Sequence, residues 1–333
     1  MPPAPPSTLD EIIASRSAAH THSVWIGEAA VGSIDRLTTA IQNPGRLRGI
    51  TTGFRELDER TGGFQRGEFV VLAGRPGMGK SALAITIARL MAQSGHHVLL
   101  NSLEMDGYSV ADRAMTDIAW QERDPIEYSR LRSGKVTRAQ QQRLMDAAQA
   151  FADLPIKIDP QGGLNISQIA ARARKHKQNL ERQGKTLDAL IIDHMHIVAP
   201  SNRYAGQPVR EVTETSGALK ALAKELNVAV IALAQLNRSV EGRDNKRPTL
   251  SDLRESGAIE QDADLIAFVF REAYYLANMT CNDAVLEGRR IDRLMEVQSV
   301  VEVNIAKQRN GPVGAVELFC DIGCNVFRDK PRR

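Results

Sequence analysis

The sequence predicts an α/β fold in which helices cover both faces of a mostly parallel sheet. Three observations support this prediction. Short apolar runs alternate along the chain with longer segments of helical periodicity. Several of these runs are continuously apolar, which is typical of parallel strands buried on both sides. The first strong run leads directly into a glycine-rich turn and a helical segment, as in phosphate-binding βα units.

The composition limits the classes of protein to which this chain can belong. The chain has 333 residues, of which 42% are hydrophobic and 25% charged, and its net charge is +3. This is ordinary globular composition, and the slight basic excess weakly favours a nucleic-acid partner. Three cysteines without a secretory signal pattern predict a reducing, cytoplasmic location, and Cys320 and Cys324 are expected to be buried thiols. No apolar run approaches the length of a membrane span, so no membrane association is expected.

Residues 1–48 differ from the rest. Residues 1–6 are Pro-rich and are expected to be disordered. Residues 24–42 carry apolar side chains at helical spacing, and Asn43-Pro44-Gly45 ends that pattern. The apolar stripe of such a helix must pack on its own domain or on a neighbouring subunit. We therefore divide the chain into residues 1–48, a disordered start and a linker helix, and residues 49–333, one α/β domain.

The elements of the α/β domain follow in order. Periodicity predicts strands at residues 69–73, 97–102, 155–159, within 187–198, and at 228–233, 265–270 and 301–306. It predicts helices at residues 82–91, 106–123, 138–151, 166–183 and 209–226. The basic run on residues 166–183 is interpreted as a solvated face rather than a DNA-binding surface.

The glycine-rich turn after the first strand carries the strongest motif. Gly74-x-x-x-x-Gly79-Lys80-Ser81 fits the P-loop pattern, between a strand and a helix as the motif requires. Glycines let the backbone N–H groups approach phosphate, and the helix N-terminus adds partial positive charge. Lys80 is expected to reach the β- and γ-phosphates and Ser81 to hold Mg²⁺. Nucleotide binding is assigned to the whole loop: Gly74, Arg75, Pro76, Gly77, Met78, Gly79, Lys80 and Ser81.

Two acidic positions complete the predicted chemistry. Asp193 ends the apolar run Leu190-Ile-Ile-Asp193, where a P-loop NTPase needs a second metal-holding carboxylate. The residue after it is His194, so the base that orients water must come from elsewhere. Glu104 is the best candidate because it follows the next predicted strand and opens onto the same sheet edge. Asp106 is its competitor, and a capping or surface role for Glu104 is the alternative.

Two polar clusters at strand ends remain to be explained. Gln235, at the end of Ala232-Leu-Ala-Gln235, is a candidate sensor of the γ-phosphate. His194-Met195-His196 suggests a metal site, since alternation along a strand would place both histidines on one face. Because no third ligand is evident, partly buried histidines are the favoured interpretation.

Two further segments suggest contacts outside the chain. The polar loop 247–259 contains Arg254 and Gly257, whose guanidinium and N–H groups suit a phosphodiester backbone. Lys307 and Arg309 follow a strand and precede a turn, on a predicted hairpin that could reach the nucleotide of a neighbouring subunit. An arginine finger of that kind contributes about 10³–10⁵-fold in rate. The alternative is a solvated basic edge strand.

These segments together resemble the DnaB family of bacterial replicative DNA helicases. The resemblance covers the chain from about residue 50 to its end, with order and spacing preserved. Its motifs are the P-loop, Ser102-Leu-Glu-Met105, Leu190-Ile-Ile-Asp193, Ala232-Leu-Ala-Gln-Leu-Asn-Arg238, Ser251-Asp-Leu-Arg-Glu-Ser-Gly257 with Glu260-Gln-Asp-Ala-Asp264, and Ile305-Ala-Lys-Gln-Arg-Asn-Gly-Pro312.

The resemblance implies a RecA-like motor domain preceded by a linker helix that docks on an adjacent subunit. Such proteins form ring hexamers, hydrolyse ATP with Mg²⁺ between subunits, move along single-stranded DNA and unwind duplex. It implies that Lys80 and Ser81 bind phosphate and Mg²⁺, that Glu104 is the catalytic base, and that Asp193 is the Walker B acid. It further implies that Gln235 couples ATP to DNA, that Arg254, Glu255 and Gly257 line the DNA, and that Lys307 and Arg309 act in trans.

The sequence departs from the family pattern at three places. The family has a helical domain before the linker helix, and residues 1–48 are too short for it; primase binding is therefore not expected, while a helicase loader remains a candidate partner. His194 and His196 stand where the family usually has Tyr and Gln. Gly217 stands within a predicted helix where the family usually has Arg, and a mid-helix glycine costs about 1 kcal/mol relative to alanine.

Two other functions are compatible with part of the pattern. One is a RecA- or KaiC-like assembly ATPase. The other is a DNA-binding or loading protein that uses ATP only to assemble. The Arg254 loop and the Lys307 and Arg309 hairpin favour the helicase over the RecA- or KaiC-like ATPase. The DNA-binding or loading protein stays open as an alternative, and strand displacement on a forked DNA separates it from a helicase.

Overall fold

The computed structural model describes residues 25–43, 45, 47–201, 204–253, 257–280 and 283–331. The chain divides into two compact units between Arg48 and Gly49, and each is described by itself. The Pro-rich start, predicted to be disordered, lies outside the described residues. None of the described helices combines the length and apolar character that a membrane span requires.

The first unit contains the predicted linker helix. Helix α2 spans Ile26–Gln42, and the Asn43 N–H bonds to the Thr39 carbonyl at its C-terminal end. Its large apolar side chains are exposed: Trp25, Ile26, Ile34, Leu37 and Ile41. The helix is thus confirmed as an element with an unburied apolar stripe.

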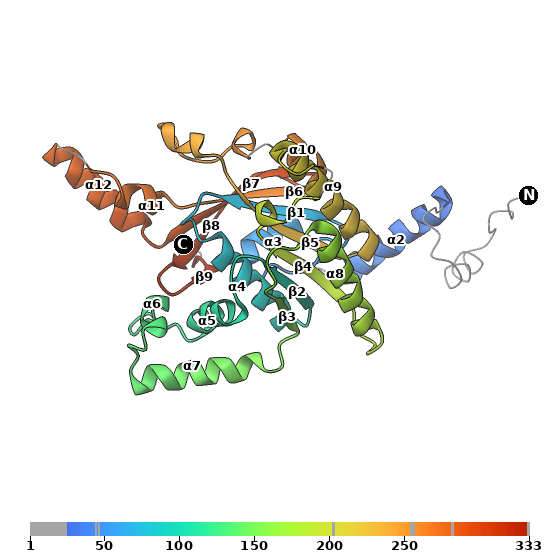
Figure 1. Ribbon diagram of the computed structural model, residues 1–333, viewed down its shortest axis with the longest axis horizontal. Coiled ribbons are helices and arrows are strands. Elements are labelled where there is room, and N and C mark those ends of the chain that lie inside the picture. The colour runs from blue at the N-terminus through green and yellow to red at the C-terminus, as the bar shows by residue number, and fades with distance from the viewer. Residues whose placement is uncertain are drawn as a thin grey trace, which may run out of the picture. The chain divides into compact units, whose positions relative to one another are not determined.

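The second unit is built on one sheet, which has nine strands within the described residues, in the order β3-β2-β4-β5-β1-β6-β7-β8-β9 (Figure 1). The six strands from β3 to β6 pair in parallel, and β7, β8 and β9 continue the sheet in antiparallel pairs. The strands are β1 Phe69–Gly74, β2 His97–Ser102, β3 Ile156–Asp159, β4 Leu187–Asp193, β5 Ala229–Gln235, β6 Leu265–Phe270, β7 Val300–Gln308, β8 Gly314–Asp321 and β9 Val326–Asp329. The predicted α/β class with a mostly parallel sheet is confirmed.

The helices of this unit connect and cover the strands. The α-helices are α3 Arg55–Thr61, α4 Lys80–Gln93, α5 Gly107–Ile118, α6 Tyr128–Arg132, α7 Arg138–Phe151, α8 Ile166–Glu181, α9 Pro208–Leu226, α10 Gly257–Asp262, α11 Glu272–Ala277 and α12 Ala284–Val297. Three 3₁₀ turns accompany them: η1 Met195–Ile197, η2 Arg238–Gly242 and η3 Leu250–Asp252.

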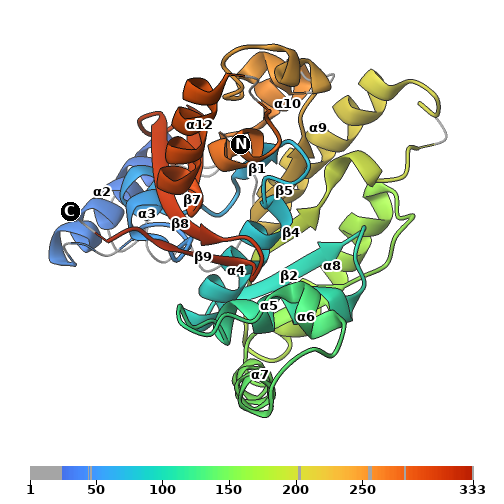
Figure 2. The ribbon, with the colours of Figure 1, turned by 90° about the vertical axis from the view of Figure 1, so that its left-hand side faces the viewer.

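Strand β1 lies in the middle of the core and is buried at every position. Its alternate side chains enter two apolar layers, because successive strand residues face opposite sides. Val70 and Leu72 pack in the layer that contains α3, α4 and α5, while Phe69 and Val71 pack in the layer under α8 and α9. Figures 1 and 2 show α8 and α9 on the sheet face opposite α4. This two-sided burial is why the strand is continuously apolar.

Local capping explains where the predicted boundaries hold. Helix α7 has the predicted bounds because Thr137 and Gln140 form a capping box at its start. Helix α5 ends at Ile118 rather than at residue 123. Just beyond it, Trp120 packs against Phe319 at a centroid distance of 5.5 Å and donates its indole N–H to Asp321. This contact with β8 draws the chain away from the helix axis.

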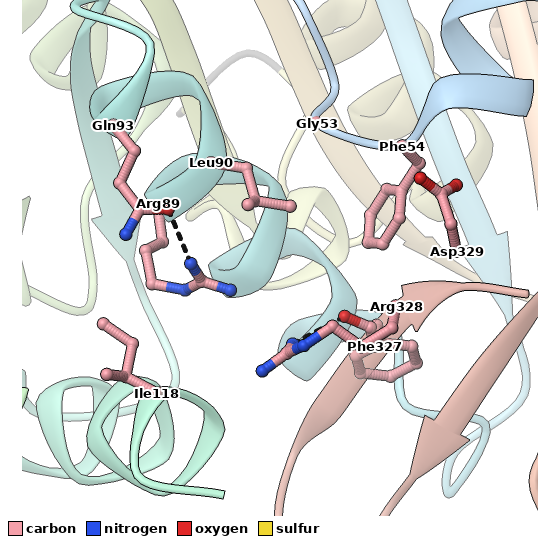
Figure 3. Close-up of a pocket in the computed structure, with 9 residues that line it drawn as sticks. All are labelled: Gly53, Phe54, Arg89, Leu90, Gln93, Ile118, Phe327, Arg328 and Asp329. Carbon is pink, nitrogen blue, oxygen red and sulfur yellow. Dashed lines mark hydrogen bonds between the residues drawn. The ribbon is translucent and has the colours of Figure 1, made fainter. Parts of the chain in front are cut away.

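A buried ionic cluster links the C-terminal half of α4 to α5 and β9. The Asp117 carboxylate of α5 accepts hydrogen bonds from Arg89 of α4 and is paired with Arg328 of β9. The two arginines line a cavity of about 340 Å³, whose apolar wall includes Phe54 and Phe327 (Figure 3). One carboxylate therefore links three elements, α4, α5 and β9.

We expect Asp117→Ala to lower the free energy of unfolding by about 3–5 kcal/mol, because it leaves two guanidinium groups without their anion. Chemical denaturation of the variant measures this loss. Asp153→Ala, at an exposed position, is the matched control and should change little. A loss for Asp117→Ala no larger than that of the control would contradict the structural role.

Replacing the glycine within α9 is expected to stabilise the protein, in contrast to Asp117→Ala. Gly217 is exposed, and a Cβ built on it would lie 3.9 Å from the Asp262 carboxylate, an ordinary contact. Gly217→Ala should therefore raise the free energy of unfolding by about 1 kcal/mol, since alanine restricts the unfolded chain and suits the helix. The reverse change at an exposed position of the same helix, Ala221→Gly, should lower it by about the same amount. Equal stability of all three proteins would refute the estimate.

Candidate active site

Topology brings the predicted site segments to one edge of the sheet. Strands β2, β4, β5 and β1 are consecutive and parallel, so their carboxyl ends lie side by side. Ser102 pairs with Asp193 across β2 and β4, and Gly74 pairs with Gln235 across β1 and β5. The segments that carry Glu104, Asp193, Gln235 and the P-loop therefore meet, although they are up to about 160 residues apart in sequence.

Two P-loop glycines combine a positive φ with a lack of space for a side chain. Gly79 is the N-cap of α4 with φ of 89°, and a Cβ there would lie 2.7 Å from the Ile322 side chain. Gly77 has φ of 80°, and a Cβ there would lie 2.7 Å from the Tyr274 ring. Both conformations disfavour other residues. The loop thus delivers the free N–H groups of the α4 N-terminus to one point, which suits a phosphate.

The side chains of Arg75 and Met78 in the P-loop make contacts that stabilise the fold. The buried Arg75 donates to the Glu241 carboxylate at 2.8 Å and to the Leu236 carbonyl at 2.8 Å. Met78 is buried in the core, whereas Pro76 and Gly77 are exposed at the tip. The guanidinium of Arg75 therefore joins the loop, through hydrogen bonds, to the segment that follows β5.

Lys80 lies among the groups predicted to act with it. Its Nζ donates to the Arg75 carbonyl at 3.1 Å. Burial lowers the pKa of Lys80 to about 8, and the neighbouring carboxylates of Asp193 and Glu104 oppose this shift. A phosphate placed here would favour the charged ammonium for the same electrostatic reason.

Asp193 and Ser81 form the candidate metal site. Asp193 is buried at the end of β4 and accepts a hydrogen bond from the Ser81 hydroxyl. Burial raises the pKa of Asp193, while the Ser81 hydrogen bond lowers it. A buried carboxylate beside a hydroxyl offers the oxygen ligands that Mg²⁺ prefers, and a cation there would offset the burial of the charge. These residues fit the predicted ion.

The structure separates Glu104 from its competitor Asp106. Glu104 follows β2, its side chain is 62% exposed, and its Oε2 lies 3.8 Å from the His194 Nε2. Asp106 is the N-cap of α5 and accepts hydrogen bonds from the Ser109 N–H at 2.8 Å and the Ser109 hydroxyl at 2.9 Å. These bonds lower the pKa of Asp106. Asp106 is thus occupied by capping, and the geometry favours Glu104 as base.

The expected strand through the two histidines is wrong. Strand β4 ends at Asp193, and residues 195–197 form the 3₁₀ turn η1, so strand alternation does not apply. The rings of His194 and His196 nevertheless lie 6.0 Å apart between centroids. The described residues contain no group of three or more His, Cys, Asp or Glu side chains that could hold a metal ion. Cys320 and Cys324 are buried free thiols, as expected.

Lys307 and Arg309 lie near the amino end of β1, whereas the P-loop follows its carboxyl end. Val70 pairs with Leu265, and Leu265 pairs with Gln308, so β7 ends beside the start of β1. At about 3.3 Å per residue, the strand from Val70 to Gly74 separates that point from the P-loop by roughly 13 Å.

The two cations at this edge have partners in their own chain. Lys307 donates to the Ala263 carbonyl at 2.8 Å, and Arg309 donates to the Gln261 carbonyl at 2.8 Å. Arg309 Nε also lies 3.4 Å from the Asp264 carboxylate. Both side chains therefore bind carbonyls at the C-terminal end of α10, where cations are favourable.

The structure describes part of the predicted DNA loop. Arg254 and Glu255 lie outside the described residues. Gly257 begins α10 and is exposed, with no atom within 4 Å of a Cβ built on it. Sequence reasoning did not single out Glu241, which pairs with Arg75, or Tyr274, which packs on Gly77. Neither residue carries a local signal, because each is brought to the P-loop only by the fold.

Comparison with known proteins identifies the family. Residues 49–329 match the model of the DnaB-like helicase C terminal domain. The chain belongs to this family. It is 38% identical to the replicative DNA helicase DnaB of Geobacillus stearothermophilus over 309 residues, and 37% identical to the replicative DNA helicase DnaC of Bacillus subtilis over 309 residues. Each alignment covers 92% of this chain and 62% of the relative, so the chain spans about three fifths of their length.

Two solved structures share the fold. One of them, an ATPase domain, superimposes with a TM-score of 0.80 at 32% identity, covering 93% of this chain and 100% of that one. A DnaB-like replicative helicase, described with its interactions with primase, superimposes with a TM-score of 0.77 at 31% identity, covering 97% of this chain and 71% of that one. The RecA-like ATPase fold that the resemblance implied is confirmed.

Proposed function

We propose that this DnaB-like chain is the motor of an ATP-dependent replicative DNA helicase. It binds ATP with Mg²⁺, hydrolyses the γ-phosphate at subunit interfaces, moves along single-stranded DNA and unwinds duplex. One observation carries the proposal: the P-loop, Glu104, Asp193 and Gln235 meet at one sheet edge, while Lys307 and Arg309 lie at the other.

Each residue of the first edge has a distinct role in the proposal. The loop from Gly74 to Ser81 cradles the phosphates, and Lys80 pairs with their charge. Ser81 and Asp193 hold Mg²⁺, which when bound neutralises charge on the phosphate oxygens. Glu104 accepts a proton from the attacking water, and Gln235 meets the γ-phosphate end of the nucleotide. The shared position of the four strand ends supports these roles.

The second edge accounts for assembly. A basic pair that lies roughly 13 Å or more from its own P-loop, measured along β1, cannot complete its own site. If one copy offers the P-loop edge and the next offers Lys307 and Arg309, the contact is head-to-tail, and head-to-tail contacts form a ring where the rotation between copies closes. We propose a homo-hexamer ring of this kind. Its other partners are single-stranded DNA at the loop of Arg254, Glu255 and Gly257, and a helicase loader.

Strand displacement on a forked DNA tests the proposal. The purified protein should release a labelled strand in the presence of ATP and Mg²⁺, and Lys80→Ala should release none. A protein that hydrolyses ATP on single-stranded DNA yet releases no strand is an assembly ATPase, and that outcome would overturn the proposed helicase activity.

A further inference from the structure

The position of Glu104 raises the question of what orients it. Its side chain is 62% exposed, and exposed carboxylates sample several rotamers. A general base works only from within hydrogen-bond reach of its proton, so an unguided rotamer would slow the reaction. His194 directly follows β4, and its Nε2 lies 3.8 Å from Glu104 Oε2.

The two nitrogens of His194 have different surroundings. Nδ1 is buried and has no hydrogen-bond partner among the described residues, whereas Nε2 faces Glu104. In a neutral imidazole one nitrogen carries the hydrogen, and only the Nε2–H tautomer directs a donor at the carboxylate. A hydrogen bond needs a separation about 1 Å shorter than the one observed, which rotation of the exposed Glu104 side chain can supply.

His196 extends this contact to β5. Its ring lies 6.0 Å from that of His194, and its Nδ1 accepts a hydrogen bond from the Gln235 N–H at 3.4 Å. The turn η1 thus places one histidine against the base and the other against the last residue of β5. Glu104, His194, His196 and Gln235 form a continuous series of neighbours across the site.

We propose that His194 is a positioning residue for Glu104, and that His196 connects this orientation to the Gln235 peptide. The inference rests on the proposed ATPase function and deepens it. A displacement of Gln235 by the γ-phosphate moves His196, and through the two neighbouring rings it changes the orientation of Glu104.

A matched pair of substitutions tests the donor. His194→Phe keeps a ring but removes the donor, and we expect it to lower kcat about tenfold or more, since a base displaced by about 1 Å loses rate on that scale. His194→Gln retains an N–H at similar reach and should keep kcat within about threefold. Neither variant should change the affinity for an ATP analogue measured without Mg²⁺, or the thermal midpoint. His176→Phe, on α8, is the control and should match the unaltered chain.

The connection to β5 is tested by a double-mutant cycle. His196→Phe removes the acceptor of the Gln235 N–H, and we expect a smaller fall in kcat than for His194→Phe. The double variant should be no slower than His194→Phe alone, because groups that act in series are not additive. Additive losses in kcat would overturn the proposed connection.

The outcomes separate this inference from the proposed function. Normal kcat in His194→Phe overturns the positioning role, and so do equal losses in the Phe and Gln variants with lowered thermal midpoints. If Glu104→Gln abolishes turnover while His194→Phe does not affect it, only the positioning role fails. If Glu104→Gln retains normal turnover, the assignment of the base fails first.

Discussion

Glu104→Gln is expected to bind ATP as the unaltered chain does and to lose turnover by about 10²–10⁴-fold, the range associated with a general base. The amide keeps the shape of the side chain but cannot accept the proton of the attacking water. ATP binding should persist because, among the described residues, Glu104 makes no hydrogen bond to the groups that would hold the phosphates. Lys80 donates to the Arg75 carbonyl, and Ser81 donates to Asp193. Steady-state ATP hydrolysis and the affinity for a fluorescent ATP analogue give the two measurements.

Asp106→Asn is the matched control for this experiment. Asparagine also caps helices well, so α5 should keep its N-terminal hydrogen bonds from Ser109. Turnover should remain close to that of the unaltered chain. Normal turnover in Glu104→Gln together with a loss in Asp106→Asn would transfer the role of base to Asp106.

Arg309→Ala is expected to lower turnover by about 10³–10⁵-fold in the assembled protein, as for other arginine fingers. The side chain lies at the sheet edge opposite its own P-loop, so the loss should reflect a site between two copies. Nucleotide affinity of the dissociated chain should stay unchanged. Arg289→Ala, at an exposed position of α12, is the control and should hydrolyse ATP normally.

Mixing two inactive variants distinguishes action in trans from action in cis. Lys80→Ala lacks a working P-loop but retains Arg309, whereas Arg309→Ala has the opposite defect. In mixed rings, an Arg309→Ala P-loop beside a Lys80→Ala neighbour has a complete site, and random assembly makes roughly a quarter of the interfaces complete. ATP hydrolysis should therefore reappear on mixing. Continued inactivity of mixed rings whose assembly is verified would place Arg309 in its own chain's site.

The sequence was most informative where local chemistry decides structure. The P-loop was predictable because its glycines and its helix N-terminus are needed for phosphate binding at fixed spacing. Strands β1 and β6 were predictable because burial on both sides makes them continuously apolar. Asp193 and Glu104 followed from the rule that ligands bind at the carboxyl ends of parallel strands.

The sequence was least informative where one segment depends on another. Strands β8 and β9 and helices α11 and α12 were not predicted. β8 alternates buried and less buried positions, and its pairing with β7 and β9 stabilises it. The end of α5 depends on Trp120 meeting β8, and the turn η1 replaced an expected strand. Each of these outcomes rests on contacts between residues far apart in sequence.

The sequence by itself therefore determined the fold class, and it supplied the candidate nucleotide loop and acidic residues, because these depend on spacing and on the hydrophobicity of single segments. Only the tertiary structure distinguished the surroundings of Glu104 from those of Asp106, since Asp106 caps α5 while Glu104 lies beside His194. It alone placed Lys307 and Arg309 across the sheet from the P-loop, and His194 beside Glu104. Each of these results depends on contacts between segments far apart in sequence, which spacing and hydrophobicity do not specify.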